Sequence, residues 1–407
     1  MGKSVCFYFQ VHQPDRLRQF RFFDIGGDFH YFDDFANRTI VRRIADRCYL
    51  RANNVLLELI RRHGGEFKVA FSISGAAIEQ FSLYAPEVID SFKALAATGC
   101  VEFLAETCSH SLASLSSEKE FKNQVKEHSA LIQKLFGVKP VTFRNTELIY
   151  SDSIGETVAS MGFKAMLTEG AKHILGWKSP DFVYTNAINP RLKVLLRNFS
   201  LSDDIAFRFS DRGWASWPLT ADTYAGWLAD ALQTGDVVNL FMDYETFGEH
   251  QKADSGIFDF LAALPAAVLS KGLNFRTPSQ VASECQPVAP LHVTYPISWA
   301  DEERDTSAWL GNELQEEAFS KVCALEKDVA RARDAKLTAA YRKLQESDHF
   351  YYMCTKFFSD GSVHSYFNPY DTPYEAFINY MNVLSDFEIR VKEKIKENNG
   401  KQSSSKA

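Results

Sequence analysis

Four polar side chains that could take part in catalysis follow runs of apolar residues. His12 follows the run 5–11, His110 lies shortly after 101–105, Glu147 follows 141–144, and Asp243 closes the run 237–243. If these runs are parallel strands, their carboxyl ends meet on one face, where barrel enzymes carry their catalytic groups. Two carboxyl groups brought together in this way suit cleavage of a glycosidic bond. One attacks the anomeric carbon or activates water, and the other protonates the leaving oxygen.

The residues around the two carboxyl groups indicate different roles for them. Arg144 and Asn145 precede Glu147, and a neighbouring positive charge favours the ionised form that a nucleophile needs. Asp243 ends an apolar run, where burial favours the protonated form that a general acid needs. We therefore expect Glu147 to be the nucleophile and Asp243 the acid/base. Arg144 and Glu245 are expected to contact the substrate.

Other interpretations of these side chains stay open. The polar set includes ligand types for Zn²⁺, so a metal-dependent barrel glycosidase or deacetylase is an alternative, although the sequence has no HxxxH pair; the residues concerned are His12, His110, Asp243 and His250. Several tryptophans could stack on sugar or belong to the core; they are Trp177, Trp214, Trp217 and Trp227. His128 lies within an amphipathic helical pattern, and we expect it at the surface.

The elements that must position these groups alternate between strand and helix up to about residue 285. Consecutive apolar residues are typical of strands buried on both faces, and they predict strands at 5–11, 68–73, 101–105, 141–144, 164–168, 193–196 and 237–243, with a weaker candidate at 274–276. Amphipathic stretches that end at glycine predict the intervening helices, at 51–63, 87–98, 118–136 and 221–234. This alternation predicts an α/β fold with a closed barrel of parallel strands.

The composition changes after residue 285. The segment 285–290 predicts a linker, 313–344 a long amphipathic helix, 356–366 a short extended piece with a glycine turn, and 374–397 a second helix. We therefore expect a catalytic barrel at 1–285 and a C-terminal helical domain at 286–398 that closes the active-site cleft. Residues 399–407 are expected to form a frayed tail.

Composition excludes several classes of protein. The chain has 407 residues, of which 45% are hydrophobic, and its net charge is −7, so it is neither a disordered chain nor one with a general footprint for nucleic acid or an anionic membrane. No apolar run approaches the ~20 residues that cross a bilayer. The seven cysteines are scattered, which indicates reduced thiols and a cytoplasmic location. Oligomeric state is not predicted.

Five short motifs, in order along the chain, resemble those of glycoside hydrolase family 57, in its α-amylase-type branch. They are His12-Gln-Pro14, Val101–His110, Phe143-Arg-Asn-Thr-Glu147-Leu, Phe241-Met-Asp243-Tyr-Glu-Thr-Phe-Gly248 and Ser347-Asp348-His-Phe-Tyr-Tyr352. The resemblance covers residues 5 to 353, and the whole set in order is specific. The chain departs from the family at the third and fifth motifs. Many members have a tryptophan where this chain has 143–145, and others have one at Tyr351 or Tyr352.

The resemblance implies a distorted (β/α)7 barrel, retention of anomeric configuration, no cofactor or required metal, and α-1,4-glucan substrates such as starch, glycogen or maltodextrin. It implies that Glu147 is the nucleophile and Asp243 the acid/base. His12 and His110 would contact the sugar, and Asp348 would reach in from the helical domain. A 4-α-glucanotransferase or a branching enzyme on the same fold is the main alternative. An inactive glucan-binding protein is a further one.

Overall fold

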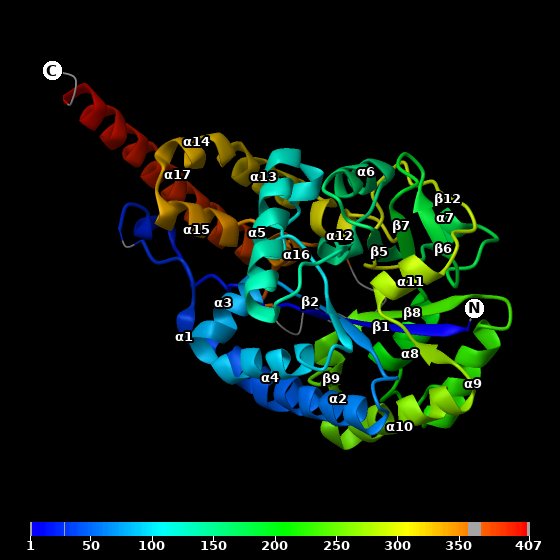
Figure 1. Ribbon diagram of the computed structural model, residues 1–407. Coiled ribbons are helices and arrows are strands. Elements are labelled where there is room, and N and C mark those ends of the chain that lie inside the picture. The colour runs from blue at the N-terminus through cyan, green and yellow to red at the C-terminus, as the bar shows by residue number, and fades with distance from the viewer. Residues whose placement is uncertain (1, 28, 357–367, 405–407) are drawn as a thin grey trace.

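The computed structural model describes residues 2–27, 29–356 and 368–404. Among these residues, parallel strands form the centre of the molecule (Figure 1). They are β1 (Ser4–Val11), β2 (Val69–Ile73), β3 (Val101–Phe103), β4 (Thr142–Arg144), β5 (Ala165–Glu169), β7 (Lys193–Arg197) and β8 (Val237–Asp243). Each lies at the position predicted from its apolar run. Every residue of β1 is buried, as expected for a strand covered on both faces.

The pairing of these strands closes a ring. β1 pairs with β8 on one side and with β2 on the other, β2 pairs with β3, and β4, β5 and β7 pair in turn. Two junctions join the halves. Ala105 bridges Phe143 beyond the end of β3, and the Asn198 backbone N–H donates to the Asn239 carbonyl at 2.9 Å between β7 and β8. Because these junctions are short, the barrel is distorted, and the predicted (β/α)7 fold is confirmed.

Among the described residues, five further strands lie outside the ring. β6 (Val183–Asn186) runs antiparallel to β7, and β12 (Pro290–Leu291) pairs with β6. β11 (Asn274–Phe275) pairs with the start of β1, while β9 (Phe247–Gly248) pairs with β10 (Gln251–Lys252). The predicted linker at 285–290 therefore ends in a strand that adds to the edge of a sheet.

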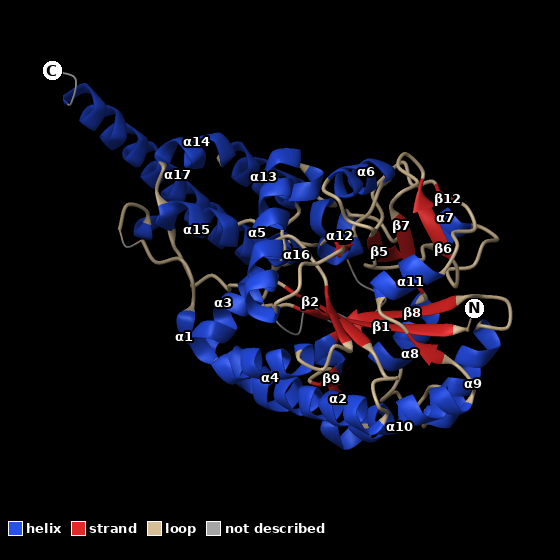
Figure 2. Cartoon of the chain, in the orientation of Figure 1, coloured by secondary structure: helices blue, strands red, loops and turns tan. Residues whose placement is uncertain are grey.

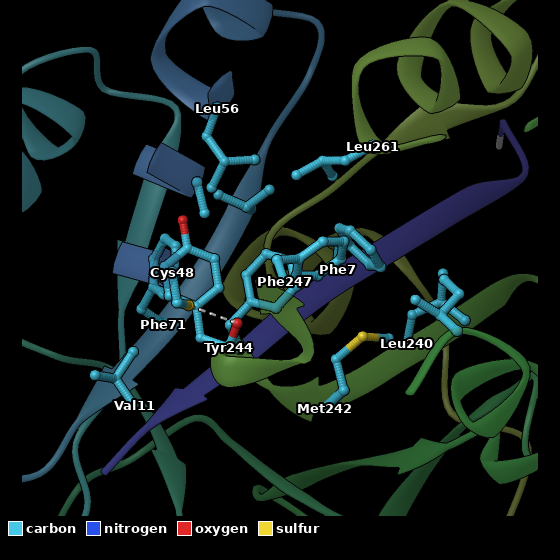
Figure 3. Packing of buried hydrophobic residues seen from close by; sticks show 14 of the residues in the cluster. Phe7, Val11, Cys48, Leu56, Phe71, Leu240, Met242, Tyr244, Phe247 and Leu261 are labelled. Carbon is cyan, nitrogen blue, oxygen red and sulfur yellow. Dashed lines mark hydrogen bonds between the residues drawn. The ribbon is translucent and has the colours of Figure 1, made fainter. Parts of the chain in front are cut away.

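Helices cover the outside of the barrel (Figure 2). They are α1 (Asp34–Ile44), α2 (Leu50–Arg62), α3 (Gly75–Tyr84), α4 (Pro86–Ala96), α5 (Glu118–Phe136), α6 (Asp152–Ser160), α7 (Lys172–Leu175), α8 (Phe199–Ala206), α9 (Ala221–Ala231), α10 (Ile257–Ser270) and α11 (Pro278–Glu284). Figure 3 shows the packing on one side, where Leu56 of α2 and Leu261 of α10 lie near Phe7 and Phe247. Burial of this apolar surface is the main force that holds the helices to the strands.

A group of helices follows the barrel: α12 (Ser307–Leu310), α13 (Glu313–Ala324), α14 (Glu326–Ala332), α15 (Ala335–Lys343), α16 (Ser347–Tyr351) and α17 (Pro373–Ser404). The prediction of one helix over 313–344 was wrong. Arg333 adopts a left-handed backbone with φ 48°, and the Asp334 side chain caps α15 by accepting from the Lys336 and Leu337 amides. A left-handed residue followed by a new N-cap interrupts a helix. The amphipathic pattern continues across the break.

The remaining expectations for this region differ in outcome. The predicted extended piece at 356–366 lies outside the described residues apart from Lys356. The helix expected at 374–397 is part of α17, which continues to Ser404, beyond the start expected for the tail. In Figure 1 the end of α17 extends away from the rest of the molecule.

The helical region and the barrel share a hydrophobic core. One buried cluster contains Met166 and Val194 on barrel strands together with Val322, Leu344 and Leu384 from the later helices. Polar contacts tie the same parts together, since the segment after β1 also reaches α17. There, the Tyr31 hydroxyl donates to Asp386 Oδ2 at 2.6 Å. The helices after residue 306 are therefore packed into the fold rather than appended to it.

Candidate active site

The predicted site residues meet at the carboxyl ends of the barrel strands. His12 follows β1, His110 follows β3, Arg144 ends β4 and Asp243 ends β8. They line one cavity, whose walls are Gln10, His12, Gln13, Pro14, His110, Arg144, Glu147, Asp243, Glu245, His250, Trp299 and Asp348. All seven of the residues selected from the sequence are in this set. The strand order brings them together, because parallel strands end on the same face.

The backbone of Glu147 is unusual. Glu147 has φ 57° and Leu148 has φ 54°, two consecutive left-handed residues that are not glycine. Such conformations cost on the order of 1–3 kcal/mol each and persist only where surrounding contacts impose them. The Glu147 carbonyl accepts from the Trp299 amide at 3.2 Å, and this bond is one of the contacts that hold the turn. The turn places the Glu147 carboxyl group in the cavity wall.

Three donors surround the Glu147 carboxylate, which is 4% exposed. His110 Nε2 lies 3.1 Å from Oε1, and Ser347 Oγ donates to the same oxygen at 3.4 Å. The indole Nε1 of Trp299 donates to Oε2 at 2.7 Å. Donors of this kind favour the ionised carboxylate and fix its orientation.

His110 is held between two glutamates. Its Nδ1 lies 2.9 Å from Glu106 Oε2 while its Nε2 faces Glu147. Burial alone would lower the pKa of His110, but the hydrogen bonds to Glu106 and Glu147 outweigh it and raise the pKa to about 9. Burial raises the pKa of Glu106, but the hydrogen bond from His110 outweighs it, so the pKa of Glu106 lies below its usual value. The group is therefore an imidazolium between two carboxylates at neutral pH.

His12 lies against His110, but its ring is neutral whereas that of His110 is charged. The two rings stack with centroids 3.9 Å apart and an angle of 17° between their planes. Burial and the charge of His110 lower the pKa of His12, and Asp348 opposes this only in part. His12 Nε2 lies 2.9 Å from Asp348 Oδ2, and Nδ1 lies 2.7 Å from Ser74 Oγ. A neutral ring that donates to Asp348 and accepts from Ser74 satisfies both contacts.

Asp243 and Glu245 form the opposite wall. Asp243 is half-buried at the end of β8. Burial, and then the nearby charge of Asp243, raise the pKa of Glu245 to about 8. Gln13 Nε2 donates to Glu245 Oε1 at 3.2 Å, and the Tyr49 hydroxyl donates to the same oxygen. Glu245 is therefore protonated at neutral pH and can donate its own proton.

Trp299 contacts the Glu147 carboxylate, although it was not selected from the sequence. Its ring lies between two guanidinium groups, with Arg144 at 5.1 Å and Arg197 at 5.8 Å from the centroid. Trp299 lies in an irregular segment, and no helical or strand periodicity in the sequence indicated that it would reach the site. None of the four tryptophans selected from the sequence lines the cavity. Of these, Trp177 is 93% exposed, and Trp214 and Trp227 pack against the core.

The expectation for His128 was also wrong. The ring is fully buried on α5. Its Nδ1 accepts from the Glu106 backbone N–H at 3.1 Å, and Nε2 donates to the Ile73 carbonyl at 2.8 Å. Burial lowers the pKa of His128, so the neutral ring fits this donor and acceptor pair. His128 thus holds the backbone at Glu106, and helical periodicity alone does not distinguish a buried histidine with two partners from an exposed one.

The cavity brings together His and acidic side chains, but within residues 2–27, 29–356 and 368–404 no three of them are grouped so as to hold a metal ion.

Comparison with known proteins identifies the family. The sequence profile described as Glycosyl hydrolase family 57 matches residues 6–298. A protein of Methanocaldococcus jannaschii named "Putative alpha-amylase" is 42% identical over 406 residues, a match that covers 96% of this chain and 85% of the relative. The chain belongs to glycosyl hydrolase family 57. The resemblance drawn from the five motifs is confirmed, and with it the expectation of an enzyme of the glycoside hydrolase type.

Solved structures support the fold. A 4-alpha-glucanotransferase from Thermococcus litoralis superposes with a TM-score of 0.64 at 15% identity, over 86% of this chain and 56% of that one. A family 57 branching enzyme from Thermococcus kodakaraensis superposes with a TM-score of 0.65 at 13% identity, over 90% of this chain and 88% of that enzyme. At these identities the likeness concerns the fold alone. Across the described part of the chain, every helix is too short or too polar to traverse a bilayer.

Proposed function

We propose that this family 57 enzyme is a retaining hydrolase of α-1,4-glucosidic bonds, of the α-amylase type. The main support for this proposal is that Glu147, held by His110 and Trp299, lines the same cavity as Asp243. The carboxylate of Glu147 attacks the anomeric carbon, and Asp243 protonates the departing glycosidic oxygen. In the second step Asp243 removes a proton from water, which releases the sugar from Glu147 with its anomeric configuration retained.

The surrounding side chains have supporting roles in this proposal. The His110 imidazolium balances the charge of Glu147 in the ground state, and the neutral ring of His12, stacked on His110 in the cavity wall, offers a surface against which sugar can pack. Arg144 is fully buried and presents positive charge beside the reacting centre. Glu245 holds the proton of the Asp243–Glu245 pair at neutral pH and passes it to Asp243 for transfer to the leaving oxygen. Asp348 approaches from α16 through its contact with His12. We propose that the helical region thereby completes the substrate cleft.

Isosteric substitution tests the two roles separately. Glu147→Gln is expected to lose at least ~10³-fold in kcat on maltodextrin while binding the glucan with little change, since the nucleophile is removed and the shape kept. Asp243→Asn should also fail on maltodextrin, yet still form the glycosyl-enzyme from an α-maltosyl fluoride, whose leaving group needs no proton. Glu284→Gln is the matched control, because Glu284 pairs with Arg276 just after β11, which pairs with the start of β1 at the amino end of the barrel. A fully active Glu147→Gln enzyme would refute the assignment.

A 4-α-glucanotransferase or a branching enzyme is the second candidate, since solved structures of the same fold carry those names. In that case sugar, not water, takes the glycosyl group from Glu147. A time course on maltoheptaose separates them, because early products longer than the substrate would replace simple hydrolysis. Glycogen in parallel reports tolerance of branches. Binding without turnover on any α-glucan would favour an inactive binding protein, and loss of activity in EDTA would favour a metal enzyme.

The cysteines bear on location. All seven are unpaired, and several of them are buried, as in Cys6 and Cys48. Free thiols persist in a reducing compartment. We propose that the enzyme acts in the cytoplasm.

A further inference from the structure

The segment that carries Trp299 is a closed loop fastened to the nucleophile. We define the 298–305 loop by its ends, where the Ser298 amide donates to the Arg304 carbonyl at 3.1 Å and Ser298 Oγ donates to the Asp305 carbonyl at 2.5 Å. Asp301 and Arg304 both have left-handed backbones, with φ 53° and 52°. Since non-glycine residues rarely adopt this conformation without support, contacts outside the loop must hold its shape.

Arg304 supplies those contacts. Its Nη1 donates to the carbonyl of Trp299, which fixes the backbone that precedes the turn. The same guanidinium faces two acidic side chains, with Nη1 4.0 Å from Glu169 Oε2 and Nη2 3.9 Å from Asp203 Oδ2. It also lies 5.4 Å from the centroid of the Phe199 ring, and its side chain is 13% exposed. Arg304 therefore joins the loop to the barrel at a second place, apart from the bonds of Trp299 to Glu147.

The acidic pair is itself rigidly held. Arg197, the last residue of β7, donates from Nη1 to Glu169 Oε2 at 3.1 Å and from Nη2 to Asp203. Its Nε donates to the Phe241 carbonyl on β8 at 2.8 Å. Arg197 is 3% exposed and Glu169 1%. Two guanidinium groups and two carboxyl groups therefore meet in a buried cluster at the ends of β5 and β7 and on α8, which follows β7.

We propose that Arg304 is a positioning residue, which fixes the 298–305 loop to the Arg197–Glu169–Asp203 cluster and so aims the indole N–H of Trp299 at the Glu147 carboxylate. The inference rests on the proposed role of Glu147 as nucleophile. The chain of contacts is continuous: Arg304 to the Trp299 carbonyl, the Trp299 amide to the Glu147 carbonyl, and the Trp299 indole to Glu147 Oε2.

The test begins with Arg304→Met, which keeps the apolar stem and removes the guanidinium. We expect kcat on maltodextrin to fall about 10²-fold with KM changed less than ~3-fold, because small displacements of a reacting group cost about this much. The acidic limb of the pH profile of kcat/KM should move to higher pH, since loss of the indole donor disfavours ionised Glu147. His110, Arg144 and Tyr351 also face Glu147, and they are unchanged in the variant.

Two further variants separate positioning from general damage. Arg276→Met removes a partly buried ion pair to Glu284 at the opposite end of the barrel and should leave both kcat and the acidic limb unchanged. Arg304→Lys keeps the charge but cannot donate in a fork, so its activity should lie between wild type and Arg304→Met. If Arg304→Met does not fold, Arg304→Lys alone decides the question. An unchanged acidic limb with wild-type kcat in that variant would overturn the proposal.

A double-mutant cycle decides whether Arg304 acts through Trp299. Trp299→Phe keeps a ring between Arg144 and Arg197 but loses the N–H. In the Trp299→Phe enzyme, adding Arg304→Met should lower kcat by less than a further ~3-fold. If the two residues acted independently, the fold-losses in kcat of the single variants would multiply. Full multiplicativity would overturn the proposal. An active Glu147→Gln enzyme would instead refute the proposed function, so the two failures are distinguishable.

Discussion

Glu245 shows how the site controls charge at the level of one side chain. The group is 4% exposed and keeps its proton to a pKa of about 8, because burial and then Asp243 disfavour a second carboxylate there. A carboxyl group whose pKa is raised on folding contributes most to stability below its unfolded pKa, and this contribution is lost as the pH rises toward the folded value. For Glu245 the loss runs from about pH 4.5 to about pH 8.

Glu245→Gln should therefore be more stable than the wild type at pH 8. The amide is neutral at every pH, accepts from Tyr49 and Gln13 as the acid does, and donates from its own nitrogen. Between pH 5 and pH 8 the free energy of unfolding of the wild type should fall relative to that of the variant, by up to ~1.4 kcal/mol per pH unit. Urea unfolding at pH 5, 6.5 and 8 measures the difference. If the free energy of unfolding of the wild type rose relative to that of the variant as the pH rises, the charge state assigned to Glu245 would be contradicted.

At this scale the sequence predicted part of the site. His12, His110 and the carboxyl pair follow strand ends, and strand ends are visible in an apolar pattern. Trp299 and Arg304 lie in an irregular loop, and their contacts depend on how residues distant in sequence meet. The charge state of Glu245 could not be predicted either, because it also depends on contacts between residues that are distant in the sequence. The Tyr49 hydroxyl, the Gln13 amide and the surrounding core set it together.

Between elements, α3 and the segment after β3 approach closely at Gly75. A Cβ on Gly75 would lie 2.4 Å from Cys108 Sγ and 2.5 Å from the Cys108 carbonyl oxygen. That carbonyl accepts from the Ala76 amide at 3.2 Å. Cys108 stands between Glu106 and His110, so displacing it moves the pair that faces Glu147. Only glycine allows the first turn of α3 to support this segment so closely.

We expect Gly75→Ala to lose ~1–3 kcal/mol of stability from overpacking and to lower kcat at least ~10-fold. Gly226→Ala is the matched control, because Gly226 lies inside α9 with nothing within 4 Å of an added Cβ. There the same change should stabilise by ~0.5–1 kcal/mol and leave kcat unchanged. Thermal unfolding and maltodextrin assays on both variants check the contrast. Equal effects at the two glycines would argue against a close approach at Gly75.

The strands were predictable where the helical region was not, and the reason is physical. Most barrel strands are buried on both faces, so their apolar runs stand out from the polar loops on either side, as β1 and β8 show. Across 313–344 the apolar stripe continues through the break at Arg333. A periodic stripe reports which face is buried, not whether the axis turns.

The whole molecule is expected to unfold as one unit, although we propose that its sequence divides near residue 285 into barrel and helical parts. Both parts contribute side chains to one buried cluster, in which Leu384 of α17 joins Val194 of β7. The loop after β1 also hydrogen-bonds α17 through Asn379, whose Oδ1 accepts from the Phe20 amide at 2.6 Å. Separating the two parts would expose this cluster to water, which is unfavourable.

Leu384→Ala should accordingly destabilise the barrel as well as α17. Leu384 is fully buried, and truncation of such a leucine costs ~2–5 kcal/mol. Loss of far-UV ellipticity and loss of maltodextrin cleavage should shift to lower temperature together, in a single transition. Ile389→Ala on the same helix is the control, since Ile389 is 43% exposed and should change stability by less than ~0.5 kcal/mol. Activity that outlasts an early helical transition in Leu384→Ala would show that the barrel holds its site without α17. The shared cluster would then not couple the two parts, and closure of the cleft by the helical region would lose its structural basis.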